Sequence, residues 1–345
     1  MSSQVSSPPS KKADRAITFR QAVTEALSLE MAKNDKVFLM GEDLGLFYGG
    51  GSFGVTPKEL FLDKYGTERI RDTPISEAGF MGAGIMAAVA GFHPVVELMF
   101  SDFVGVCLDQ IVNQGAKMRY MFGGQVEVPL TVRTTYGAGF SFAATHSQSL
   151  YSVFAHFPGV KVVVPSSPYD AKGLLTTAMH DRNVVVFFEH KGLYPTKGGE
   201  VPEQQYEVPF GQADVKRQGE DATVVAVGMM TNRSLQAAKE LAEEGLSVEV
   251  VDPRTIVPLD LKTILESVKK TSRLVIVDED YLNCGFSAEV AAEVADEAFG
   301  FLDAPIKRVA NPNIPIPYAK HLEDIVIPNV EAIKKSIRQV VSPQA

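Results

Sequence analysis

The sequence predicts an α/β protein of two domains, each a mostly parallel sheet flanked by helices. Short runs of β-branched and aromatic residues alternate with longer segments of helical period, the pattern of βαβ units around a parallel sheet. A stretch rich in glycine, proline and polar residues, 193–215, interrupts this alternation, and a second series follows it. At 345 residues the chain also exceeds the usual length of one domain. We therefore predict a first domain over 16–195, a linker over 196–214 and a second domain over 215–345.

The elements of the first domain follow from period and capping. Runs rich in valine, isoleucine and phenylalanine predict buried parallel strands. Ser76 and Ser167 precede segments of helical spacing, as N-cap residues do. The predicted strands are 36–43, 94–100, 128–135, 160–167 and 183–190. The predicted helices are 76–91, 102–121, 146–157 and 167–181.

The second domain repeats this alternation. Its helices end at Gly245 and Gly300, and glycine is common just after a helix. The predicted strands are 221–228, 247–252, 273–280 and 305–310. The predicted helices are 232–245, 260–270 and 287–300.

Composition and charge exclude several classes of partner. A net charge of −9, with no lysine or arginine cluster beyond short pairs, argues against a nucleic-acid or membrane partner. Cys107 and Cys284 form no CxxC motif, which fits the reducing cytoplasm. Residues 1–15 are rich in serine, proline and lysine without an apolar segment, so we expect a disordered tail that is neither signal peptide nor anchor.

The stretch "DTPISEAGFMGAG" contains three glycines that invite a dinucleotide-binding interpretation. Gly79, Gly82 and Gly84 are spaced GxxGxG and lie inside the predicted helix, whereas the Rossmann fingerprint needs them in the turn before it. We interpret them as residues that allow close helix packing. An NAD-dependent dehydrogenase remains an alternative, which predicts that the isolated chain binds NAD in a calorimeter.

Glu77 heads the same predicted helix and has two interpretations. An acidic residue in the first turn complements the helix dipole, typically for about 0.3–1 kcal/mol. The helix is apolar on all sides, however, which predicts that it is buried. A buried carboxylate must be paired or change its protonation, and such groups concentrate at functional sites.

His146 follows a predicted strand and a glycine-containing loop. The carboxyl ends of parallel strands are where open α/β sheets bind ligands. A single loop histidine is also common as a surface or packing residue, so both interpretations stay open. No other histidine has the spacing of a zinc site.

A series of motifs carries a resemblance to a known family. The segments "DTPISEAGFMGAGIMAAVAGFHPVVELMFSDF", "DQIVNQGAKMRYMFGG", "AATHSQSLY" and "VDPRTIVPLD" occur in a fixed order. Together they resemble the β subunit of the thiamine-diphosphate-dependent component of 2-oxoacid and acetoin dehydrogenase complexes, in the transketolase superfamily. The resemblance runs from about residue 16 to the end. It implies a transketolase-like pyrimidine-binding domain followed by a transketolase C-terminal domain.

The resemblance also implies roles for individual residues. Glu77, in the "SE" motif, would hydrogen-bond N1′ of the cofactor's aminopyrimidine and shuttle its proton. Phe103, in "SDF", would stack on the pyrimidine ring. His146, in "HSQ", would handle protons on the cofactor-bound substrate and in its passage to the lipoyl group. A potassium ion would be held largely through backbone carbonyls near Leu130, Ala178, Asp181 and Asn183.

The resemblance implies partners as well. The superfamily holds the cofactor's diphosphate and Mg²⁺ with a "GDG…N" signature, and this chain contains no GDG. An α subunit would supply it, in an α2β2 heterotetramer that serves a lipoyl-bearing acyltransferase. The segments "FGVTPKEL" and "FFEHKGLY" resemble acetoin dehydrogenase β subunits most, with pyruvate and branched-chain 2-oxoacid enzymes as the alternative. A noncatalytic scaffold of the same fold is a further alternative, against which Glu77 and His146 in their motifs argue.

Overall fold

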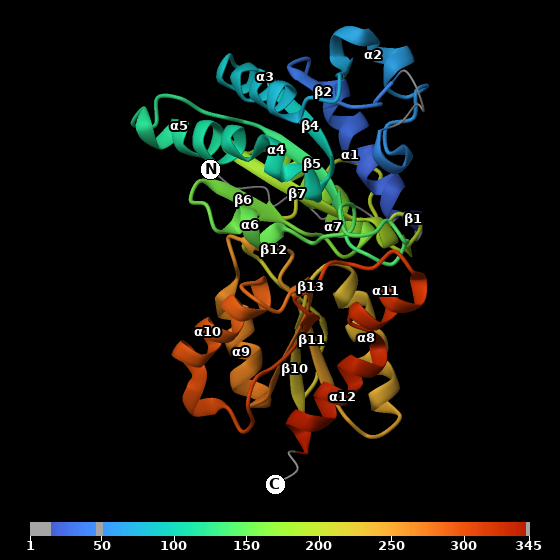
Figure 1. Ribbon diagram of the computed structural model, residues 1–345, viewed down its shortest axis with the longest axis vertical. Helices are drawn as coiled ribbons and strands as arrows, with labels where there is room; N and C mark the ends of the chain where they lie inside the picture. The colour runs from blue at the N-terminus through green and yellow to red at the C-terminus, as the bar shows by residue number, and fades with distance from the viewer. Residues whose placement is uncertain (1–14, 46–50, 343–345) are drawn as a thin grey trace, which may run out of the picture.

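The computed structural model describes residues 15–45 and 51–342, and the predicted tail, Arg15 excepted, lies outside them. Figure 1 shows two units, one above the other, each a sheet with helices on both faces. Both sheets are mostly parallel, so the predicted fold class is confirmed.

The first sheet has seven strands in the order β12-β6-β7-β5-β4-β2-β3. All are parallel to their neighbours except β12, which runs antiparallel to β6. The five predicted strands are confirmed; β3 and β12 were not predicted. The strands are β2 Val37–Gly41, β3 Ile70–Asp72, β4 His93–Phe100, β5 Thr131–Tyr136, β6 Val160–Val163, β7 Val184–His190 and β12 Thr255–Val257.

Helices cover both faces of this sheet because its strands are apolar on both. Val37 and Leu39 face the core beneath one set of helices, whereas Phe38 and Met40 face the other. One face is covered by α1 (Phe19–Lys33) and α7 (Pro168–His180). The other is covered by α3 (Glu77–Val89), α4 (Val104–Asp109), the π-helix η3 (Gln110–Gly115), α5 (Ala116–Met121) and α6 (Tyr151–Ala155). Shorter elements are β1 (Ile17–Thr18), η1 (Ser52–Gly54), α2 (Leu62–Arg69), η2 (Ser101–Phe103), η4 (Lys191–Leu193) and β8 (Lys197–Gly198).

The second sheet has five strands in the order β14-β13-β10-β11-β9, of which only β9 is antiparallel to its neighbour. Its four predicted strands are confirmed. The strands are β9 Asp214–Arg217, β10 Ala222–Ala226, β11 Val248–Asp252, β13 Leu274–Tyr281 and β14 Lys307–Asn311. The helices are α8 Met229–Ala242, α9 Leu261–Thr271, α10 Phe286–Ala298, η5 Phe299–Phe301, α11 Lys320–Val326 and α12 Val330–Val341.

A strand pairing and a hydrophobic cluster join the two units in addition to the linker. Strand β12 belongs by sequence to the predicted second domain, yet it pairs with β6 of the first sheet. One hydrophobic cluster runs from Val132 and Val186 of the first sheet to Ile264 and Phe286 of the second unit. The predicted domain boundaries therefore stay a prediction.

The helix predicted over 146–157 begins later, at Tyr151. Residues 146–150 are irregular, and Ser147 and Ser149 are buried there. The Ser101 hydroxyl donates to the Gln148 carbonyl at 2.8 Å. A tertiary contact, and not a helical hydrogen bond, therefore fixes this backbone.

Helix 102–121 was predicted as one helix and is interrupted by the π-helix η3. Gly300 lies inside η5 without a positive φ, so the prediction that a helix ends at this glycine is wrong, whereas Gly245 has φ +85°.

Among the described residues, no helix is both long enough and apolar enough to cross a membrane.

The glycines of α3 differ in the space around them. A Cβ added at Gly84 would lie 2.6 Å from Cγ2 of Val96 in β4. At Gly82 the nearest atom would be Cγ of Gln110 at 3.6 Å, an ordinary contact. Close packing of α3 on the sheet therefore needs glycine at position 84 only.

We expect Gly84→Ala to destabilise the chain by about 1–3 kcal/mol, because the added methyl group overpacks the contact with β4. The matched change Gly82→Ala should be neutral or stabilising, by up to about 1 kcal/mol, because alanine favours helix. Urea unfolding of the two variants measures both. Equal effects would show that Gly84 is not a packing residue.

Candidate functional site

The candidate residues lie at one edge of the first sheet. Glu77 begins α3, which follows β3, and Phe103 ends η2, which follows β4. His146 lies in the loop after β5, residues 137–146, which we call the histidine loop. Because these strands are parallel, their carboxyl ends meet at the same edge, where open α/β sheets bind ligands.

Glu77 is a buried carboxylate whose charge influences a second carboxyl group. Its side chain is 7% exposed, and none of the residues that the structure describes donates a hydrogen bond to it. Burial, followed by the negative charge of Glu77, raises the pKa of Glu42 to about 7. The same two causes raise the pKa of the Cys107 thiol in α4 to about 12. With no donor among the described residues, the Glu77 carboxylate can accept a hydrogen bond from an N–H donor such as a ring nitrogen.

Phe103 and His146 are in contact. Their ring centroids are 5.3 Å apart at 84°, and the Phe100 ring packs on the same imidazole at 4.8 Å. The hydroxyl of Thr145 lies 3.0 Å from Nδ1 of His146. The imidazole is therefore held edge-on between two aromatic rings, half exposed.

Hydrogen bonds join the "SDF" and "HSQ" motifs directly. The backbone and side-chain amides of Gln148 donate to Oδ1 of Asp102 at 3.2 and 3.0 Å. Ser101 donates to the carbonyl of the same glutamine. These bonds fix Phe103 and His146 relative to each other.

The second unit holds the start of the histidine loop. Glu279, in β13, accepts from the backbone N–H of Ala138 at 2.6 Å. Glu323, in α11, accepts from Gly139 at 2.7 Å and from Ser141 at 3.1 Å. Both carboxylates are buried. They satisfy a loop backbone that no sheet or helix supports.

His190, at the end of β7, connects the Glu279 carboxylate to the first sheet. Its Nε2 lies 2.8 Å from the Glu279 carboxylate. Its Nδ1 accepts from Gly192 N–H at 3.0 Å, so the Nε2 proton points at Glu279. Burial opposes ionisation, but His190 and the Ala138 amide hold the pKa of Glu279 below its ordinary value.

A buried triad underlies the site. Arg133, in β5, donates to Glu97 of β4 at 2.8 Å and to both oxygens of Glu189 in β7 at 2.6 and 2.9 Å. The three side chains are 4% exposed or less. Burial disfavours the charge, but Glu189 and Glu97 raise the pKa of Arg133 above its ordinary value.

Sequence reasoning missed this triad as well as Glu279, Glu323 and His190. A signal was present for the triad, because each member is a charge inside a run that predicts a buried strand. No local signal marks Glu279 or Glu323 as partners of a loop in the other domain.

The residues expected near a potassium ion lie at the opposite edge of the sheet. The Leu130 carbonyl accepts from Val185 N–H at 2.9 Å, and that of Ala178 accepts from Asp181 N–H at 3.2 Å. Asn183 donates to the Asp181 carboxylate, which also pairs with Lys161. Oxygen atoms suit a hard cation. The Asp181 carboxylate already pairs with an ammonium group, so backbone carbonyls would have to hold the ion, and the potassium site stays a prediction.

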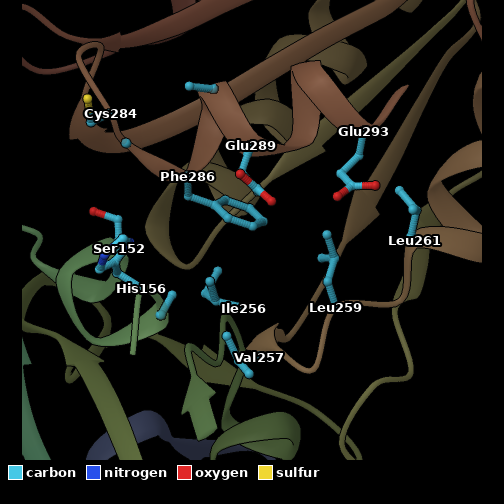
Figure 2. Close-up of a pocket in the computed structure, with 13 residues that line it drawn as sticks. Ser152, His156, Ile256, Val257, Leu259, Leu261, Cys284, Phe286, Glu289 and Glu293 are labelled. Atoms are coloured by element: carbon cyan, nitrogen blue, oxygen red, sulfur yellow. The ribbon is translucent and has the colours of Figure 1, made fainter. Parts of the chain in front are cut away.

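A cavity of about 720 Å³ lies between the two units, away from these residues. Figure 2 shows Phe286, Glu289 and Glu293 of α10 on one side of it and Ile256, Val257 and Leu259 on the other. Glu77, Phe103 and His146 do not line it. The candidate site is therefore defined by its side chains and not by this cavity.

Comparison with known proteins gives two family matches. Residues 15–197 match the pyrimidine binding domain of transketolase, and residues 211–333 match the transketolase C-terminal domain. The chain is 50% identical to the β subunit of acetoin:2,6-dichlorophenolindophenol oxidoreductase of Bacillus subtilis, over 92% of this chain and 95% of that one. Its counterpart in Cupriavidus necator is 47% identical over 95% and 98%. The 2-oxoisovalerate dehydrogenase β subunit of B. subtilis is 41% identical over 94% and 98%.

Among solved structures, the chain is similar to a split-gene transketolase described as an inactive β4 tetramer. The TM-score is 0.75 with 22% identity, covering 94% of this chain and 98% of that one. This likeness shows the fold.

We expect Arg133→Met to destabilise the chain by about 3–5 kcal/mol, because it leaves two buried carboxylates without their cation. The matched change Arg182→Met removes an exposed arginine that pairs with Glu127 and should change stability by less than about 1 kcal/mol. Denaturant unfolding at neutral pH compares them. If the triad did not stabilise the fold, the two variants would unfold at similar denaturant concentrations.

The electrostatic interaction between Glu77 and Glu42 is testable by titration. Burial is the main cause of the raised pKa of Glu42, about 7, and the charge of Glu77 is the next. Glu77→Gln removes that charge, so the pKa of Glu42 should fall but stay above the ordinary 4.5. Carbon-13 NMR of labelled glutamates measures it, with Glu127→Gln as control. No change in the titration of Glu42 would mean that the two carboxylates do not interact.

Proposed function

Because the chain belongs to the thiamine-diphosphate-dependent β subunits of acetoin and 2-oxoacid dehydrogenases, built from the two transketolase domains, we propose that it is the β subunit of an acetoin dehydrogenase. With an α subunit it would cleave acetoin and transfer the two-carbon fragment to lipoamide of the partner acyltransferase. The observation that carries the proposal is the 50% and 47% identity to two acetoin oxidoreductase β subunits along nearly the whole chain. The alternative substrates are pyruvate and branched-chain 2-oxoacids, whose β subunits are 41–42% identical.

Thiamine diphosphate supplies, when bound, the nucleophile and electron sink that cleavage beside a carbonyl requires. Glu77 would hold the proton at N1′ of its aminopyrimidine. The buried Glu77 carboxylate, with no donor among the residues described, fits such a partner. Phe103 would present its ring to the pyrimidine, at the edge of the aromatic group that it forms with Phe100.

His146 would move a proton at the substrate oxygen and assist transfer to the lipoyl group. Its imidazole is half exposed and fixed by Thr145, Phe100 and Phe103. A base held in this way keeps its orientation while one edge remains open to a substrate.

The α subunit would bind the diphosphate and Mg²⁺, since this chain has no GDG motif. We propose an α2β2 heterotetramer with the cofactor shared between the subunits. A potassium ion near Leu130, Ala178, Asp181 and Asn183, and a cytoplasmic location, stay predictions.

Glu77→Gln, co-expressed with the α subunit, should lower dye-coupled acetoin oxidation at least about 100-fold, because glutamine cannot exchange the N1′ proton. Glu127→Gln, on the surface, serves as the control. Turnover of Glu77→Gln near that of the wild type would remove Glu77 from the mechanism.

Steady-state kinetics of the purified α–β complex under saturating thiamine diphosphate test the choice of substrate. We expect kcat/KM for acetoin to exceed that for pyruvate and for 3-methyl-2-oxobutanoate by roughly 10-fold or more, since pocket shape separates such substrates by this amount. A preference for either oxoacid would replace the proposal by its alternative.

A further inference from the structure

A buried lysine lies directly behind His146. Lys191 begins η4 just after β7 and is 2% exposed. Its ammonium donates to the backbone carbonyl of His146. It also lies 5.2 Å from the ring centroid of Phe100 and 5.0 Å from that of Phe142. One carbonyl and two aromatic faces thus surround a cation that has no part in the proposed roles of Glu77, Phe103 and His146.

Three consecutive residues at the junction of β7 and η4 hold three different parts of the site. Glu189 binds Arg133, His190 lies against Glu279, and Lys191 holds the end of the histidine loop. Glu279 and Glu323 hold only the start of that loop. Lys191 is therefore the side-chain contact that fixes the backbone of His146 itself, among the residues described.

The histidine loop needs such a contact. Ser141 and Ala143 have φ of +56° and +61°, a conformation that non-glycine residues rarely adopt. Strained backbone persists only where the surroundings hold it. Without the ammonium group, the carbonyl of His146 would lose its partner and the loop its anchor.

The charges facing Lys191 come from three other elements. They are Asp102 of η2, Glu279 of β13 and Glu323 of α11. Within the described part of the chain, none forms an ion pair with it at 4.0 Å or less. Burial lowers the pKa of the Lys191 ammonium to about 8, and the three carboxylates oppose that shift. A buried cation without a salt-bridge partner is costly to keep.

We propose that Lys191 is a positioning residue, which fixes His146 through its backbone carbonyl so that the imidazole meets the substrate in one orientation. This inference rests on the proposed function. Lys191 would govern the step in which His146 moves a proton, and not the binding of substrate or cofactor.

The test uses the purified complex with its α subunit. Lys191→Met should lower kcat for acetoin on the order of 10- to 100-fold while KM changes less than about 3-fold, because small misplacements reduce rate more than binding. Lys191→Arg, which keeps a cation, should retain more activity than Lys191→Met. A rise in KM with unchanged kcat would overturn the proposal.

The pH profile gives an independent readout. Because the pKa of Lys191 is about 8, the wild-type kcat should fall as pH rises through that value and the ammonium loses its proton. Arginine stays charged above pH 12, so Lys191→Arg should lose this alkaline limb. Persistence of the alkaline limb in Lys191→Arg would overturn the proposal. This measurement can be made even if Lys191→Met does not fold.

Lys172 offers a matched control. It is also fully buried, with a pKa lowered by burial to about 8, but it lies in α7 and binds Glu25 and the carbonyls of Pro202 and Glu203. Lys172→Met should leave kcat unchanged; an equal loss in both variants would show that Lys191 is merely structural.

His146→Asn separates this inference from the proposed function. Loss of turnover in His146→Asn with unchanged kcat in Lys191→Met would overturn the role of Lys191 alone. Full turnover in His146→Asn would overturn the roles of His146 and Lys191 while leaving the proposed function in place, whereas a wild-type complex that does not turn over acetoin would overturn the proposed function itself.

Discussion

The buried guanidinium of Arg133, between the carboxylates of Glu97 and Glu189, is the interaction on which the site depends. It ties β5 to β4 and β7 from inside the first sheet, with three charge-assisted hydrogen bonds between apolar layers. Such a group tolerates few alternative arrangements, because any slip in register would leave a buried charge unpaired. The loops that leave the same three strands carry Phe103, His146 and Lys191. The triad therefore sets the spacing from which the site is built.

The second unit supports the candidate site through contacts with loops of the first unit. Its carboxylates Glu279 and Glu323 receive the backbone of the histidine loop, and Asp278 and Asp280 accept from Tyr151 and Ser152 at the start of α6. Burial, followed by the charge of Asp278, raises the pKa of Asp280 to about 7. A shared hydrophobic cluster and the pairing of β12 with β6 join the units further. The transketolase C-terminal domain thus acts here as the support for a loop of its neighbour.

The hydrophobic pattern of the sequence predicted the strands, because local residue order largely determines them. Every predicted strand formed, because a run of valines buried on both faces has few other solutions. The helix expected from residue 146 began at Tyr151, since Asp102, Ser101 and Lys191 hold that backbone in another conformation. The sequence pattern marked Glu77 and His146 only as candidates, and their roles came from the resemblance. The carboxylates that position the histidine loop were not predictable, because they lie more than a hundred residues away in sequence and meet it only in the folded chain.

We propose that this chain provides the pyrimidine half of a thiamine diphosphate site whose diphosphate half belongs to another subunit. A crystal structure of the α–β complex with thiamine diphosphate tests it most directly, through the distance from the Glu77 carboxylate to N1′ of the pyrimidine. We expect a hydrogen-bond distance of about 2.6–3.2 Å, with Phe103 against the ring and the diphosphate on the α subunit. A cofactor bound wholly within the α subunit, or a pyrimidine beyond the reach of Glu77, would contradict it.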